Sequence, residues 1–161
     1  MISKKVILTG SFGVGKTSLF NQFIYNKFDE KYLTTIGVKV NKKTINVEGE
    51  ELSILLWDIA GEVAQDKVPT SYFLGASGII YVLDLTRPST YKNLKADIEY
   101  LKEITQGGII KIIGNKKDLV SEEKLFEIKN EIDLPWDLVT SAKTGENVEQ
   151  LFLILGRELV T

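Results

Sequence analysis

An eight-residue segment at positions 10–17, reading Gly-Ser-Phe-Gly-Val-Gly-Lys-Thr, constrains the fold more than any other part of the chain. It has the spacing G-x-x-x-x-G-K-[ST], follows an apolar run at 6–8 and precedes a helical pattern at 17–26. Glycines at such a turn let successive backbone N–H groups point inward, and the start of the next helix adds positive potential, so the segment suits an anion. Lys16 is then expected to reach the β- and γ-phosphates of a nucleotide, and the Thr17 hydroxyl to ligate Mg²⁺. An ordinary glycine-rich turn between a strand and a helix is the alternative.

The rest of the chain alternates short apolar runs with amphipathic segments, which is typical of an α/β domain with a largely parallel sheet. The runs at 6–8, 54–57, 79–83 and 109–113 are nearly continuous and rich in β-branched residues, as in strands covered on both faces. The segment 38–47 alternates instead, which predicts a half-exposed edge strand, and 48–50 predicts a hairpin to the next strand. Helical patterns occupy 17–26, 91–105, 122–131 and 147–160. We expect residues 1–161 to form a single domain, because no linker or repeat interrupts the pattern.

Composition removes several classes of chemistry. The chain has no Cys and no His, which excludes disulfides, thiolate metal sites, cysteine nucleophiles and the commonest general base. Lys plus Arg number 20 against 22 for Asp plus Glu, and this balance argues against a nucleic-acid partner. No targeting segment is visible, and without Cys neither prenylation nor palmitoylation is possible. We therefore expect a cytoplasmic protein with no lipid anchor in this chain.

Three further groups of residues lie where apolar runs end. Asp58 follows the run at 54–57, and Gly61 comes three residues later. This spacing suits a second Mg²⁺ contact at Asp58 and a γ-phosphate sensor at Gly61. The alternative is that Asp58 only caps a turn at the end of the strand. Asn-Lys-Lys-Asp at 115–118 and Ser-Ala-Lys at 141–143 are polar turns when each is taken alone. Together they suit recognition of a base, because the Asp118 carboxylate can accept two N–H bonds from guanine, and adenine lacks the amino group that guanine has at that position. Asp118 therefore favours GTP over ATP.

With these motifs in this order, the chain resembles a small Ras-superfamily GTPase of the Rab type from residue 4 to residue 160. The resemblance implies the P-loop NTPase (small G-protein) fold, with a mostly parallel six-stranded sheet, one antiparallel edge strand and helices on both faces. It implies GTP or GDP and Mg²⁺ as cofactors. The positions that match the family's nucleotide-binding motifs are Gly13, Val14, Gly15, Lys16, Thr17, Ser18, Phe28, Thr35, Gly61, Asn115, Lys116, Asp118, Ser141, Ala142 and Lys143. Those that match its Mg²⁺ ligands are Thr17, Thr35 and Asp58.

The same resemblance implies a molecular switch that slowly hydrolyses GTP to GDP. Glu62, Lys16 and Gly61 are its expected catalytic residues, and switch I (about 28–37) and switch II (about 58–74) its expected signalling segments. An effector, an exchange factor and an activating protein are the expected partners. The chain is expected to be a monomer or to enter a nucleotide-dependent complex.

Two substitutions depart from the family pattern. Glu62 stands where the family has a Gln that orients the attacking water, and the sign of its effect stays open. Phe12 is large where the family has a small residue; it would obstruct an activating arginine, cover the phosphates or face solvent. Neither Arg87 nor Arg157 lies in a switch, so no internal arginine is expected at the γ-phosphate and hydrolysis should be slow. A GTP-binding scaffold with little or no hydrolysis remains an alternative because of Glu62 and Phe12, and a P-loop kinase or ATPase is a third, against which Asp118 argues.

Overall fold

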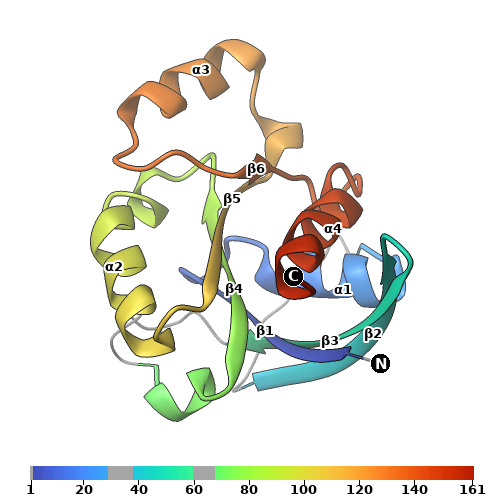
Figure 1. The fold of residues 1–161 in the computed structure, drawn as a ribbon. Coiled ribbons are helices and arrows are strands. Elements are labelled where there is room, and N and C mark those ends of the chain that lie inside the picture. The colour runs from blue at the N-terminus through green and yellow to red at the C-terminus, as the bar shows by residue number, and fades with distance from the viewer. Residues whose placement is uncertain (1, 29–37, 60–67) are drawn as a thin grey trace.

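A computed structural model describes residues 2–28, 38–59 and 68–161. In these residues one six-stranded sheet has the order β2-β3-β1-β4-β5-β6 (Figure 1). Its strands are β1 (Ile2–Gly10), β2 (Val38–Val47), β3 (Glu50–Ile59), β4 (Ala76–Asp84), β5 (Ile109–Asn115) and β6 (Leu138–Val139). All neighbouring strands run parallel except β2, which is antiparallel to β3 at the edge of the sheet. The predicted mostly parallel sheet with one antiparallel edge strand is confirmed.

The β2–β3 hairpin closes through a two-residue turn, since Val47 pairs with Glu50. Both turn residues have positive φ, 51° at Glu48 and 90° at Gly49. Such a turn matches the twist of the flanking strands, and the glycine tolerates it without strain.

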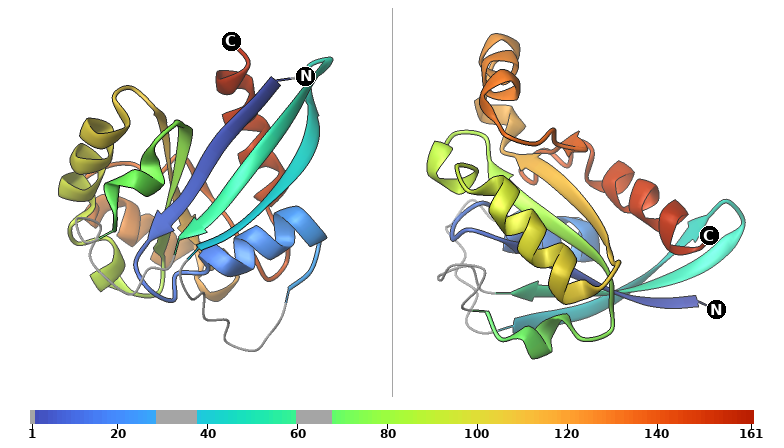
Figure 2. Two further views of the ribbon diagram at one scale, coloured as in Figure 1. Left: turned by 90° about the horizontal axis from the view of Figure 1, so that it is seen from below. Right: turned by 60° about the vertical axis from the view of Figure 1, so that its left-hand side comes forward.

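Helices cover both faces of the sheet, as predicted (Figure 2). They are α1 (Lys16–Tyr25), α2 (Leu94–Thr105), α3 (Glu122–Glu131) and α4 (Val148–Leu159), with the short 3₁₀ helices η2 (Thr70–Phe73), η3 (Pro88–Thr90) and η4 (Lys117–Leu119). Because side chains alternate along a strand, Val6 and Leu8 pack in the core beneath α1 and α4, while Ile7 packs in the core beneath α2. Stacked rings of Phe23 and Phe152, with centroids 3.6 Å apart, join α1 to α4.

The α2 helix begins three residues later than the predicted segment 91–105, because η3 and a turn precede it.

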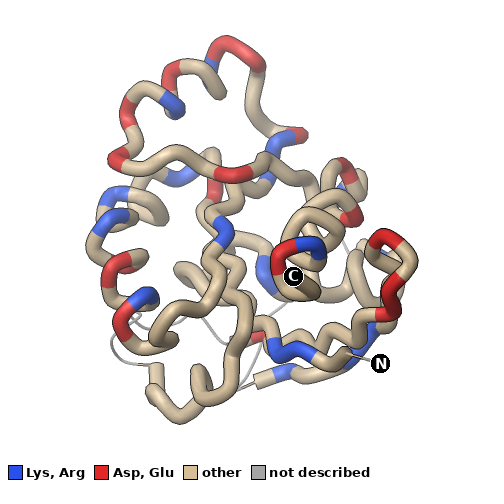
Figure 3. The backbone as a smooth tube through the Cα atoms, in the orientation of Figure 1, with Lys and Arg blue, Asp and Glu red and all other residues tan. Residues whose placement is uncertain are grey.

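Along α2 and α3 acidic and basic residues are interspersed (Figure 3). Of the helices in the described residues, none is long and apolar enough to span a bilayer.

The sheet register brings several strand ends to one edge. Leu8 lies beside Asp58, Gly10 beside Val82, and Asp84 beside Asn115. Loops that follow parallel strands emerge at this carboxyl edge, where open α/β sheets bind ligands. The polar motifs of the sequence therefore meet there.

Candidate phosphate and base site

The loop between β1 and α1 is built on close approaches that exclude side chains. Gly10 has a φ of 141°, and a Cβ at this position would lie 2.2 Å from the Val82 carbonyl oxygen. Gly15 has a φ of 103°, and a Cβ there would lie 2.2 Å from Nδ2 of Asn115. These two positions require glycine for backbone conformation and for space.

The loop leads directly into the N-terminus of α1. Among the described residues no side chain caps this terminus, and its first turn has no acidic residue. The first N–H groups of a helix have no partner within the helix, and they carry positive potential. The loop is thus suited to an anion, as the sequence predicted.

Lys16 lies at the start of α1 with its side chain folded back along the loop. Its Nζ donates to the carbonyl oxygens of Gly10 (3.1 Å) and Ser11 (2.8 Å). Burial lowers the pKa of this ammonium group to about 8, the Asp58 carboxylate raises it, and the Arg87 charge lowers it further. A phosphate group would supply the opposite charge that this buried cation favours.

Thr17 and Asp58 meet although they are 41 residues apart in sequence. The Thr17 hydroxyl donates to Oδ2 of Asp58 at 2.5 Å, and the Asp58 side chain is fully buried at the end of β3. Hydroxyl and carboxylate oxygens are the donor types that Mg²⁺ takes in nucleotide sites, so the donor set fits this ion. Thr35, Gly61 and Glu62 lie outside the described residues.

Asn115, at the end of β5, connects the β1–α1 loop with the loop that follows β6. Its Nδ2 donates to the Val14 carbonyl at 3.0 Å. Its Oδ1 accepts from the Thr140 hydroxyl at 2.9 Å and from the Ala142 amide at 3.3 Å. The side chain is buried, so one amide group holds two loops in fixed relation.

The predicted base-binding residues gather around this link. The Ser141 hydroxyl donates to Oδ1 of Asp118 at 2.8 Å, which fixes one oxygen of an otherwise exposed carboxylate. Lys116 has a left-handed backbone, with a φ of 70°, and its Nζ lies 2.9 Å from Oδ2 of Asp84. Lys143 is exposed at the rim.

The remaining predicted residues lie on α1 or close to it. Val14 is fully buried in the core beneath α1 and α4, and Ser18 is half-buried in the first turn of α1. Phe28 is partly buried and packs against the same core.

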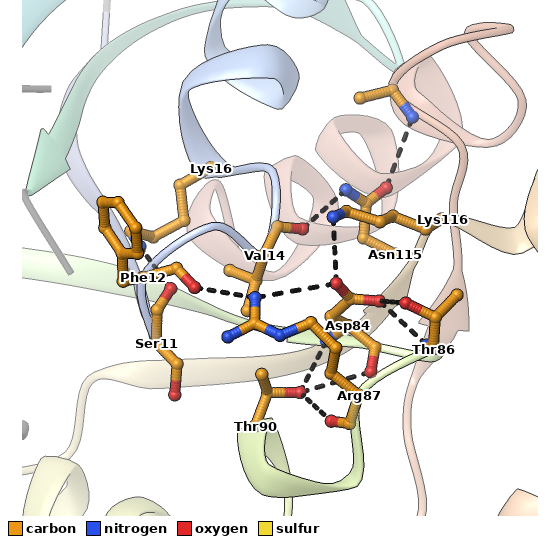
Figure 4. A network of polar contacts seen from close by, with 11 residues as sticks. Ser11, Phe12, Val14, Lys16, Asp84, Thr86, Arg87, Thr90, Asn115 and Lys116 are labelled. Atoms are coloured by element: carbon orange, nitrogen blue, oxygen red, sulfur yellow. Dashed lines mark hydrogen bonds and ion pairs between the residues drawn. The ribbon is translucent and has the colours of Figure 1, made fainter. Parts of the chain in front are cut away.

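Four residues that the sequence motifs did not include also belong to this region: Gln22, Asp84, Arg87 and Thr140. The Gln22 amide donates to the Ala142 carbonyl at 2.8 Å. Asp84 is fully buried between Lys116 and Arg87 (Figure 4). One signal was available, because Asp84 ends an apolar strand just as Asp58 does.

Phe12 is 42% exposed, so its ring is not part of the core, and its carbonyl accepts from Nη1 of Arg87 at 2.9 Å.

Comparison with known proteins assigns a family to this geometry. The model of the Ras family matches residues 5–161. The human Ras-related protein Rab-4B is 38% identical over 164 residues, which span 97% of this chain and 76% of that protein. The GTP-binding protein ypt1 of Schizosaccharomyces pombe is 34% identical over 161 residues (96% and 79%), and the Ras-related protein Rab-13 of Canis lupus familiaris is 33% identical over 162 residues (97% and 79%).

Proposed function

The chain belongs to the Ras family of small GTP-binding switch proteins, and we propose that it is a Mg²⁺-dependent switch that hydrolyses GTP slowly and signals through residues 28–37 and 58–74. The observation that carries this proposal is the Asn115 side chain, which bonds both to Val14 in the phosphate loop and to the loop 140–142. A ligand that has phosphates at one end and a base at the other fits two loops tied in this way. In this proposal residues 1–161 form one GTPase domain.

Mg²⁺ would be held by Thr17 and Asp58, with Thr35 as the third residue. The contact between the Thr17 hydroxyl and Asp58 supports this assignment, because both donors already converge at the start of α1. When bound, the ion would neutralise charge on the β- and γ-phosphate oxygens. Gly13 to Ser18 would hold the phosphates through backbone N–H groups, and Lys16 would exchange its two carbonyl partners for phosphate oxygens.

Guanine would be read by Asp118, held in place by Ser141, with Asn115, Lys116, Ala142 and Lys143 around it and Phe28 beside the ring. A site built to pair two N–H donors rejects a base that lacks one of them, often by several orders of magnitude. The Asp118→Asn variant should therefore shift preference from guanosine to xanthosine diphosphate, which carries the complementary group. Competition binding of the two nucleotides would measure this shift, with the exposed Asp133→Asn as the matched control. Unchanged guanosine preference in Asp118→Asn would contradict the assignment.

In hydrolysis, a water oxygen forms a bond to the γ-phosphorus while the bond to the β,γ-bridging oxygen breaks, which gives GDP and inorganic phosphate. Gly61 would donate its amide to the γ-phosphate, Lys16 would stabilise charge on it, and Glu62 would contact the water. Without a supplied arginine the reaction should be slow, since such a residue together with loop ordering is worth about 10⁵-fold in this class.

A GTP-binding scaffold with little or no hydrolysis is the second candidate, because Glu62 replaces the usual Gln. Single-turnover hydrolysis of preloaded GTP, with and without Mg²⁺, separates the two functions. Measurable Mg²⁺-dependent turnover that Lys16→Ala abolishes supports the switch. No turnover in wild type, with turnover restored in Glu62→Gln but not in the exposed control Glu149→Gln, supports the scaffold.

Effectors would contact an apolar face of the sheet next to switch II. Val40 (44% exposed) lies opposite Trp57 in the β2–β3 register, and Leu74 is 72% exposed beyond η2. The centroids of the Trp57 and Tyr72 rings lie 6.5 Å apart. Exposed apolar side chains grouped in this way mark interaction surfaces. Exchange and activating factors would act on the same switch, as Rab-type relatives generally require.

A further inference from the structure

Arg87 reaches the phosphate loop although it belongs to the turn that follows β4. Its Nη1 donates to the Phe12 carbonyl at 2.9 Å and lies 3.8 Å from Oδ2 of the buried Asp84 (Figure 4). The contact joins residues 75 positions apart in sequence. Arg87 matches no nucleotide-binding motif, so the proposed function gives it no role.

The turn that carries Arg87 is fixed by its own hydrogen bonds. The Arg87 amide donates to the Asp84 carbonyl at 3.0 Å, and the Thr90 amide donates to the Arg87 carbonyl at 3.0 Å. The amide and hydroxyl of Thr86 both donate to Oδ1 of Asp84, at 2.8 and 2.6 Å. The Asp84 carboxylate is thus oriented before it meets the guanidinium group, and Pro88 restricts the backbone directly after Arg87.

The bond to Phe12 determines where the next amide points. A peptide unit is planar and trans, so the Phe12 carbonyl and the Gly13 N–H point to opposite sides. Lys16 already bonds the Gly10 and Ser11 carbonyls. Lys16 and Arg87 together therefore hold the carbonyls of residues 10, 11 and 12. Because Arg87 binds the Phe12 carbonyl, the Gly13 N–H points to the opposite side of the peptide, away from the guanidinium group.

We propose that Arg87 is a positioning residue for phosphate binding, which acts by holding the Phe12–Gly13 peptide so that the Gly13 N–H donates to a phosphate beyond the α position. This inference rests on the proposed function, in which Gly13 to Ser18 hold the phosphates. It assigns Arg87 no contact with the nucleotide. Its effect should depend on the length of the phosphate chain, since GMP has no phosphate at that position and GDP does.

Competition binding of GDP and GMP to the full chain tests the inference. The variants are Arg87→Ala, Arg87→Lys and, as control, Arg157→Ala, which removes the other arginine of the chain and its ion pair with Glu48. Arg87→Ala removes a charge-assisted hydrogen bond of a half-exposed side chain. We therefore expect it to weaken GDP binding about tenfold and GMP binding less than about twofold. Arg87→Lys should recover part of the GDP affinity because it retains one cationic donor, and Arg157→Ala should match wild type.

A second readout follows the peptide itself. The backbone amide resonance of Gly13 should shift in nucleotide-free Arg87→Ala and remain near its wild-type position in Arg157→Ala. Equal losses of GDP and GMP affinity, or no loss of either, would overturn the inference. If Arg87→Ala does not fold, the same comparison of GDP and GMP affinity is made with Arg87→Lys and Arg87→Gln. Gln keeps a hydrogen-bond donor but removes the charge. Failure of wild type to prefer GDP over ADP would overturn the proposed function instead, which keeps the two outcomes distinct.

Discussion

Replacing Asn115 by alanine should be among the most destabilising single changes near the site. The substitution removes three hydrogen bonds, to the Val14 carbonyl, the Thr140 hydroxyl and the Ala142 amide. Val14 and Thr140 are fully buried and Ala142 is 3% exposed, so water does not reach the vacated partners freely. A buried polar group left without a partner costs about 1–3 kcal/mol. The Thr140 hydroxyl can rotate to another acceptor, so we expect a total loss of about 3–5 kcal/mol in the free energy of unfolding.

Two further variants divide this loss between its parts. Asn115→Asp keeps the Oδ1 acceptor but turns a carboxylate oxygen toward the Val14 carbonyl, so it should cost about 2–4 kcal/mol. Thr140→Val removes only one donor, while the Ala142 amide still occupies Oδ1, so it should cost about 1 kcal/mol.

Urea unfolding of nucleotide-free protein provides the measurement, since bound nucleotide would add its own stabilisation and mask the effect. Asn130→Ala, an exposed asparagine on α3, is the matched control and should change the unfolding free energy by less than about 0.5 kcal/mol. An Asn115→Ala protein within about 1 kcal/mol of wild type would refute the reasoning, because the three bonds would then carry no net free energy.

Two other perturbations have outcomes set by single contacts. The buried Tyr81 hydroxyl donates to Asp97 at 2.6 Å, and burial raises the pKa of this phenol, so it ionises more readily in the unfolded chain. Above pH 10 the free energy of unfolding of wild type should therefore fall by about 1.4 kcal/mol per pH unit relative to that of Tyr81→Phe. Urea unfolding of both proteins at pH 8 and pH 11 measures this difference. An identical pH dependence in both proteins would contradict this. Gly10→Ala would place a Cβ 2.2 Å from the Val82 carbonyl oxygen at a φ of 141°. The substitution should therefore lower the free energy of unfolding by more than about 2 kcal/mol and weaken GDP binding. A thermal unfolding midpoint within a degree of wild type would contradict this, because β1 and β4 would then have moved apart at little cost.

Much of the fold could be predicted because its signals are local. Near-continuous apolar runs predicted the parallel strands, and the alternation in 38–47 predicted the edge strand with the same bounds as β2. The helix predicted at 122–131 also matches α3, which begins after the Ser121 cap. The predicted start of α2 was wrong because the chain first forms η3 and a turn, in which the Asp84 amide donates to the Thr90 hydroxyl.

The site divides in the same way. Motif residues such as Lys16, Asp58 and Asn115 could be found because their spacing in the chain is itself the signal. Asp84 offered one such signal, because it ends an apolar strand. Arg87 offered none, because only the sheet brings it to the β1–α1 loop: β4 lies beside β1 on one side and β5 on the other. A turn that follows β4 is therefore a neighbour of the β1–α1 loop, although no local pattern in 85–90 indicates it.

One carboxylate links the two ends of the site. Lys116 belongs to the loop that follows β5 and Arg87 contacts the β1–α1 loop, yet both cations pair with Oδ2 of Asp84. Since this oxygen is fully buried, a shift of either cation changes the charge balance felt by the other. The energetic effects of substituting Arg87 and Lys116 should therefore not add, as expected for side chains that share a partner. In the proposed function, this shared carboxylate would couple recognition of the base to recognition of the phosphates without a movement of the sheet, because the coupling needs only one fixed carboxylate between two loops.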